Sequence, residues 1–73
     1  MAKYDYSKLK GRIVEKVGTQ RRFSELIGVS EHTLSSKLCS HTPWTQTEIA
    51  QSCEVLDISP ERIAAYFFTR EVQ

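Results

Sequence analysis

Apolar residues recur three to five positions apart along this chain, which is the spacing of one face of an α-helix. In the first such stretch they are Leu9, Ile13, Val14 and Val17. Asp5 precedes this stretch as a candidate N-cap, and Gly18 follows it as a residue that readily adopts the left-handed conformation. The pattern therefore predicts a helix that begins after Asp5 and ends at about Val17.

Two shorter helices are predicted on either side of Gly28. Thr19 is a candidate N-cap for a helix over residues 20–27, and Ser30 is a candidate N-cap for a helix over residues 31–38. The apolar residues of these two helices are Phe23, Leu26, Ile27, Leu34 and Leu38. Because Gly28 can adopt a positive φ without a steric cost, the pattern predicts two helices that meet at a tight corner instead of one bent helix.

The fourth helix has the clearest start signal in the chain. Thr45 and Glu48 have the spacing of a capping box, and Trp44 and Ile49 have the spacing of a hydrophobic staple. The predicted buried stripe of this helix is Ile49, Ala50, Cys53 and Leu56.

A fifth helix is predicted from Ser59 as N-cap and Pro60 as first helical residue. Its expected inward residues are Ile63, Ala64, Phe67 and, less clearly, Phe68. Tyr66, Phe67 and Phe68 cannot all face the interior of so short a helix, so at least one of them is available for a partner. The alternation over residues 68–72 fits either a frayed end or an edge pairing. Together these signals predict an all-α fold, a compact five-helix domain that occupies residues 1–73.

Composition narrows the function classes. With 40% hydrophobic and 26% charged residues, the chain has the balance of a soluble globular protein. Its longest apolar run, residues 63–68, is too short to cross a bilayer, and no signal peptide is evident, so a cytoplasmic location is expected. Cys39 and Cys53 have the spacing of neither a disulfide framework nor a zinc site, which predicts free thiols and no metal.

No motif of catalysis stands out. The sequence has no Gly-rich phosphate loop and no evident Ser-His-Asp or Cys-His arrangement, so we expect neither an enzyme, a small-molecule substrate nor a cofactor. The net charge of +1 is unevenly spread. Residues 1–44 carry eight basic and four acidic side chains, whereas residues 45–73 carry two basic and five acidic ones. A polyanion would therefore meet the first half of the chain.

The corner around Gly28 carries a family resemblance. Ser24 is small, Gly28 follows four residues later, and Val29 and Leu34 are apolar. Through "QRRFSELIGVSEHTLSSKL", Gln20 to Leu38, the chain resembles the Cro and phage-repressor family of helix-turn-helix proteins. The start "YDYSKLKGRIVEKVGTQ" and the end "IAAYFFTREVQ" look more narrowly like the small Cro-like modulators of repression of temperate phages of Gram-positive bacteria. The resemblance implies a lambda repressor-like helix-turn-helix fold and a location inside the bacterial host.

In that family the third helix lies in the major groove of DNA. The resemblance thus implies a DNA- or partner-binding set, which comprises Gln20, Arg21, Ser30, Glu31, His32, Ser35, Ser36 and Lys37. Arg22 and the loop residues Ser40, His41 and Thr42 are further candidates for phosphate contacts. The start of the third helix departs from the usual readers of base edges, because it has no Arg or Lys for guanine and no Asn or Gln for adenine.

Several of these residues have a plainer interpretation. Arg21 and Arg22 also fit a solvated helix face. A carboxylate at the position of Glu31 stabilises the N-terminal end of a helix dipole whether or not it binds a partner. His32 fits an ordinary exposed histidine, and Trp44 fits a staple.

Two functions remain. The first is a transcriptional regulator that binds double-stranded operator DNA through its third helix, with a homodimer on a two-fold operator. The alternative is an anti-repressor or modulator of repression, which binds the DNA-binding domain of a phage repressor through the same helix. The missing Arg and Lys on the reading face favour the alternative slightly.

Overall fold

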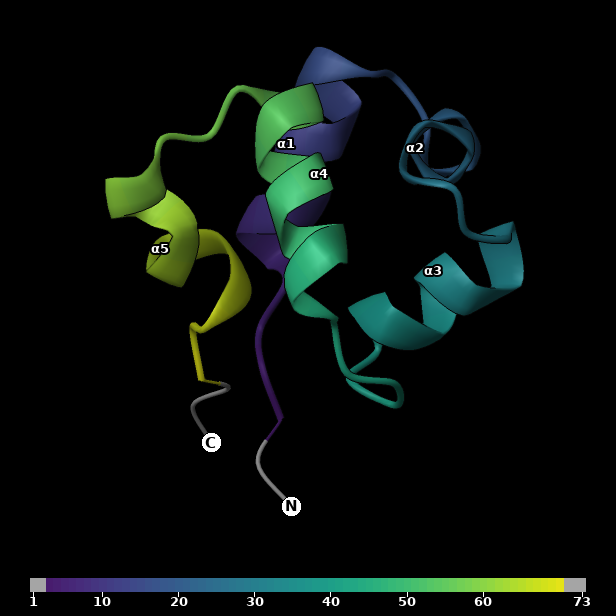
Figure 1. Ribbon diagram of the computed structural model, residues 1–73. Helices are drawn as coiled ribbons and strands as arrows, with labels where there is room; N and C mark the ends of the chain where they lie inside the picture. The colour runs from purple at the N-terminus through teal and green to yellow at the C-terminus, as the bar shows by residue number, and fades with distance from the viewer. Residues whose placement is uncertain (1–2, 71–73) are drawn as a thin grey trace.

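The computed structural model describes residues 3–70, and its regular elements there are helices (Figure 1). The helices are α1 (Ser7–Lys16), α2 (Gln20–Ile27), α3 (Glu31–Leu38), α4 (Gln46–Leu56) and α5 (Ile63–Phe67), and the short 3-10 helix η1 (Pro60–Arg62) leads into α5. The predicted all-α, five-helix fold is therefore confirmed for this part of the chain. No helix within residues 3–70 has both the length and the apolar composition that a membrane span requires.

Local capping explains where the helices begin. The side chain of Thr19 accepts a hydrogen bond from Arg22 N at 3.1 Å. Ser30 caps α3 in the same way, through Thr33 N at 3.0 Å. Thr45 and Glu48 form the predicted capping box, in which each side chain accepts from the backbone N–H of the other residue. These three predicted N-caps are confirmed.

The start of α1 differs by one residue from the prediction. Tyr6, not Asp5, is the N-cap residue. Asp5 still supplies the polar contact, because its Oδ1 accepts a hydrogen bond from Ser7 N at 2.8 Å. At the other end, Gly18 has the predicted positive φ, 103°.

Gly28 forms the corner between α2 and α3. Its φ of 76° and ψ of 29° are left-handed, and Val29 N donates to Ser24 O at 3.0 Å, which closes the end of α2. Figure 1 views α2 almost along its axis while α3 runs across the picture, so the two helix axes cross steeply. Ser24 is buried, as expected of a small residue near the corner.

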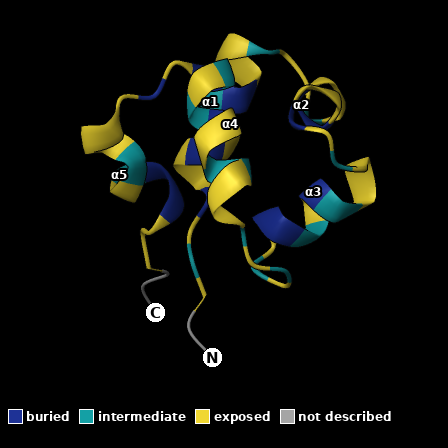
Figure 2. Cartoon of the chain, viewed as in Figure 1, coloured by how far each residue is buried: buried dark blue, intermediate teal, exposed yellow. Residues whose placement is uncertain are grey.

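The core collects residues from each of the helices α1 to α5, and Figure 2 shows the dark blue segments turned toward the middle of the molecule. Its buried hydrophobic members are Tyr6, Leu9, Ile13, Phe23, Ile27, Leu34, Leu38, Leu56, Ile58, Tyr66 and Phe67. At about 25 cal/mol per Å² of buried apolar area, such side chains supply most of the favourable free energy of folding.

Some predicted core positions are wrong. Val14 is 60% exposed, because it lies about 100° around α1 from Ile13 and the buried residues of this helix are Leu9 and Ile13. Leu26 is 44% exposed, since the buried face of α2 is centred on Phe23, Ser24 and Ile27.

The stripes of α4 and α5 also differ from the prediction. In α4 the buried small residue is Ser52, whose Oγ donates to Glu48 O at 2.7 Å, while Ala50 is exposed. Near the end of the chain Ala64 and Phe68 are exposed, whereas Tyr66 is buried beside Phe67.

The segments before α1 and after α5 lie side by side (Figure 1). Asp5 N donates to Thr69 O at 2.7 Å, and Tyr4 forms an isolated antiparallel bridge with Arg70. This pairing agrees with the edge-pairing alternative as far as Arg70; Val72 lies outside the described residues. Ser40, which has a positive φ of 63°, joins the loop after α3 to the same segment, because its Oγ accepts from Tyr4 N and donates to Tyr4 O, both at 3.1 Å.

Candidate interaction face of α3

The start of α3 presents an exposed polar surface, which we call the α3 face and define as Ser30, Glu31, His32 and Ser35. The opposite side of the helix is buried through Leu34, Lys37 and Leu38. The α3 face therefore points outward because the apolar residues of this helix anchor the other side in the core.

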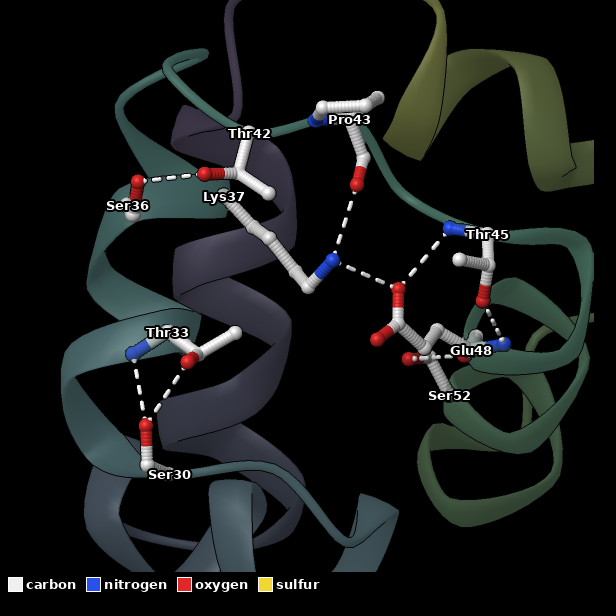
Figure 3. Close-up of polar contacts among 9 residues, drawn as sticks. All are labelled: Ser30, Thr33, Ser36, Lys37, Thr42, Pro43, Thr45, Glu48 and Ser52. Carbon is white, nitrogen blue, oxygen red and sulfur yellow. Dashed lines mark hydrogen bonds and ion pairs between the residues drawn. The ribbon is translucent and has the colours of Figure 1, made fainter.

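The hydroxyl groups of α3 are used unequally. Ser30 Oγ accepts from Thr33 N at 3.0 Å and donates to Thr33 Oγ1 at 2.8 Å, so it is occupied by capping (Figure 3). Ser36 is half-buried, and its hydroxyl lies 2.7 Å from Thr42 Oγ1, which ties α3 to the following loop. Within residues 3–70 the Ser35 hydroxyl has no such internal partner. It is therefore the serine of α3 best placed for an outside contact.

Lys37 is a correction to the predicted contact set. It is only 3% exposed, and its Nζ lies 2.7 Å from Glu48 Oε1 and donates to Pro43 O at 2.8 Å. An ammonium held in this way cannot reach a phosphate or a partner outside the protein. The warning was present in the sequence, because Lys37 stands three residues after Leu34 and thus on the apolar stripe of its helix.

The Lys37 contact also changes the chemistry of Glu48. Burial disfavours the charged carboxylate, but the hydrogen bonds from Lys37 and from Thr45 N outweigh burial, so the pKa of Glu48 lies below its ordinary value. The Glu48 carboxylate is therefore charged at neutral pH and lies in contact with the Lys37 ammonium. The net charge that remains on the α3 face is the single negative charge of Glu31.

The predicted residues of α2 lie at the surface. Arg21 and Arg22 are exposed, and Gln20 is half-buried at the first position of the helix. Arg22 makes a loose ion pair with Glu25 at 3.9 Å, between two side chains that are more than half exposed. Such pairs contribute about 0–1 kcal/mol, so Arg22 remains free to turn to another anion.

An aromatic hollow lies beside the loop after α3, and sequence reasoning did not find it. It has a volume of about 360 Å³ and is lined mainly by Tyr4, Tyr6, Trp44, Phe67 and Phe68. Trp44 and Ile49, the predicted staple pair, both line it, and the Trp44 ring packs edge-on against Phe67 with 5.1 Å between centroids. The residues come together through the pairing of the two end segments, and the alternation over residues 68–72 did not identify the segment with which it pairs.

The cysteines are free thiols. Cys39 is exposed and Cys53 is half-buried. Among the residues that the structure describes, no three His, Cys, Asp or Glu side chains gather in a way that could hold a metal ion.

Comparisons with known proteins place these features in context. No curated protein matched the chain. Among solved structures, the chain is similar to the modulator of repression of the temperate bacteriophage TP901-1 from Lactococcus lactis, with 44% sequence identity and a TM-score of 0.79. The match covers 96% of this chain and 95% of the other. It supports the narrower resemblance, to modulators of repression, whereas the broader one to Cro and phage repressors stays a prediction.

A family model matches nearly the whole sequence and includes α1 to α5, the α3 face and the aromatic hollow. Residues 1–70 fit the model described as a protein of unknown function, DUF739, and the chain therefore belongs to that family.

Proposed function

We propose that this protein modulates repression by binding a phage repressor, and that the α3 face is its contact surface. The observation that carries the proposal is the similarity, over nearly the full length of both chains, to a phage modulator of repression. The repressor-binding alternative predicted from the sequence is thus better supported than operator binding.

The charge of the α3 face fits a protein partner. Because Lys37 is paired inside the molecule, Glu31 is the charged group of this face, and the neighbouring His32 and Ser35 are polar and exposed. The DNA-binding surface of a repressor carries Lys and Arg for phosphate contacts. A carboxylate that meets an arginine fork there forms two parallel charge-assisted hydrogen bonds, so Glu31 would occupy a place otherwise taken by a phosphate. Binding would then mask the repressor from its operator.

Charge reversal at Glu31 tests this proposal. Glu31→Lys places like charges against a basic partner, and we expect co-elution with the repressor of the encoding phage to be lost. Glu54→Lys is the matched control, since Glu54 is an exposed glutamate on α4, away from the α3 face. Equal co-elution of wild type and Glu31→Lys would exclude the α3 face as the contact surface.

Operator DNA is a second candidate, favoured by the corner between α2 and α3 and by the exposed Arg21 beside Gln20. The free backbone N–H groups at the start of α2 suit a phosphate. If DNA is bound, Gln20→Ala and Ser35→Ala should weaken a shifted operator band, and affinity should fall steeply as salt rises. No shift by the wild-type protein at about 50 mM salt would remove this candidate.

A single titration separates the two functions. The purified protein is added to labelled operator alone, to repressor alone, and to the repressor–operator complex. A modulator releases operator from the complex and binds repressor without operator, whereas an operator-binding regulator shifts the DNA by itself. The elution volume of the free protein in the same series tests the predicted homodimer.

A further inference from the structure

We propose that Lys37 and Glu48 are positioning residues, which set the orientation of α3 and so of the α3 face without touching the partner themselves. This inference rests on the proposed function of that face. It assigns to Lys37 a role different from the surface contact that the sequence predicted.

The geometry of the pair is specific. Figure 3 shows Lys37 reaching from α3 across to the start of α4, where its Nζ meets Glu48 Oε1 at 2.7 Å and Pro43 O at 2.8 Å. The same Glu48 oxygen accepts from Thr45 N at 2.8 Å. One carboxylate thus closes the capping box of α4 and holds the end of α3. The side chains of Lys37 and Glu48 are only 4% and 15% exposed, so water competes little for these contacts.

The pair lies where it controls the rotation of α3. At about 100° per residue, Lys37 projects from the opposite side of the helix to Glu31, His32 and Ser35. Along its length α3 packs chiefly on α2, from which it leaves at the Gly28 corner. The Lys37 contact is a separate attachment, near the other end of α3, to the loop and to α4. Together with the buried Leu34 and Leu38, this second attachment resists rotation of α3 about its axis, so its exposed side keeps one direction.

Burial alone would not require charges here. A methionine would fill the place of the lysine stem, and a buried ion pair loses much of its attraction to desolvation. Unlike apolar packing, the charge-assisted hydrogen bonds require one direction and one distance, which selects a single arrangement of the two helices. The hydrogen bond between Ser36 Oγ and Thr42 Oγ1, which lie 2.7 Å apart, holds the loop in the same arrangement.

The test replaces the ion pair and keeps the fold. In Lys37→Met with Glu48→Gln, the glutamine can still accept from Thr45 N, so the capping box is retained. We expect a melting temperature close to wild type, displaced amide resonances at Glu31, His32 and Ser35, and affinity for the repressor lower by about tenfold, within the range of couplings between side chains in contact. Lys16→Met with Glu54→Gln is the matched control, because it removes the same two charges from exposed sites; it should leave all three readouts unchanged.

The outcomes separate this inference from the proposed function. If wild type does not bind repressor, the proposed function fails, while the amide resonances still report whether α3 has moved. Unchanged resonances on the α3 face together with unchanged affinity would overturn the positioning role. So would an equal loss of affinity in the control, since net charge would then be the cause. If the double variant does not fold, Glu48→Gln alone, which keeps Lys37 and the capping box, must displace the same three resonances for the inference to stand.

Discussion

Replacing Gly28 by alanine should destabilise the protein, whereas the same replacement at Gly11 should stabilise it. Apart from its chain neighbours and the backbone of its own helix, a Cβ at either position meets no heavy atom within 4 Å, so tertiary packing contributes to neither change. What differs is the backbone: Gly28 has a left-handed φ of 76°, and Gly11 lies inside the helix α1. The two substitutions therefore isolate the backbone preference of alanine.

The expected size follows from that preference. A left-handed backbone costs a residue with a Cβ about 1–2 kcal/mol, and for a domain of this length each kcal/mol lowers the Tm by about 4–8 °C. Alanine inside an exposed helix gains about 0.5–1 kcal/mol over glycine. Thermal unfolding followed by circular dichroism should thus show Gly28→Ala below wild type and Gly11→Ala above it.

A third variant checks the cause. Asparagine tolerates the left-handed conformation better than alanine, so Gly28→Asn should lie between wild type and Gly28→Ala. Equal melting temperatures for wild type and Gly28→Ala would refute the reasoning, because the corner would then not need the left-handed backbone. A loss far larger than the backbone cost would refute it too, since it would reveal a packing role for the glycine.

Three further predictions concern side chains. Lys37→Met alone leaves the Glu48 carboxylate mostly buried without its cation. Urea unfolding should therefore show a free energy of unfolding lower by about 3 kcal/mol, and an unchanged midpoint would contradict the buried pair. Because the pKa of Glu48 is lower in the folded protein than its ordinary value of 4.5, the stability from this group is complete above that value and is lost as the pH falls through the folded pKa. When the free energy of unfolding is measured at several pH values between neutral and acid, it should change less with pH for Glu48→Gln than for wild type. Burial raises the pKa of the Cys53 thiol, so alkylation by iodoacetamide should modify the exposed Cys39 first, as peptide mass spectrometry can verify.

Local signals predicted the ends of the helices well, because a cap depends on a few neighbouring residues. Thr19, Ser30 and the Thr45–Glu48 box needed no knowledge of the tertiary structure. The direction of each helix does depend on its partners. Val14 and Leu26 have the right spacing for the core, yet their helices turn other residues toward it.

The candidate site shows the same limit. Glu31, His32 and Ser35 could be placed on an exposed surface from the apolar spacing of α3 alone. Lys37 was misplaced, although its spacing from Leu34 puts it on the apolar stripe of α3. Its partner Glu48 lies on another helix, so no local pattern could identify the ion pair. The role of the α3 face in binding stays a prediction, which the repressor titration tests.

The pairing of the segments before α1 and after α5 has a consequence for the order in which the protein folds. Contacts within and between neighbouring helices join residues close in sequence and form quickly, whereas the Asp5–Thr69 hydrogen bond closes a loop over almost the whole described chain. The few hydrogen bonds between the two end segments offset little of the entropy lost on closing this loop. The two segments should therefore pair last during folding and separate first during unfolding. Transient separation of these two segments would expose the rings of the aromatic hollow to solvent, while the corner at Gly28 stays folded.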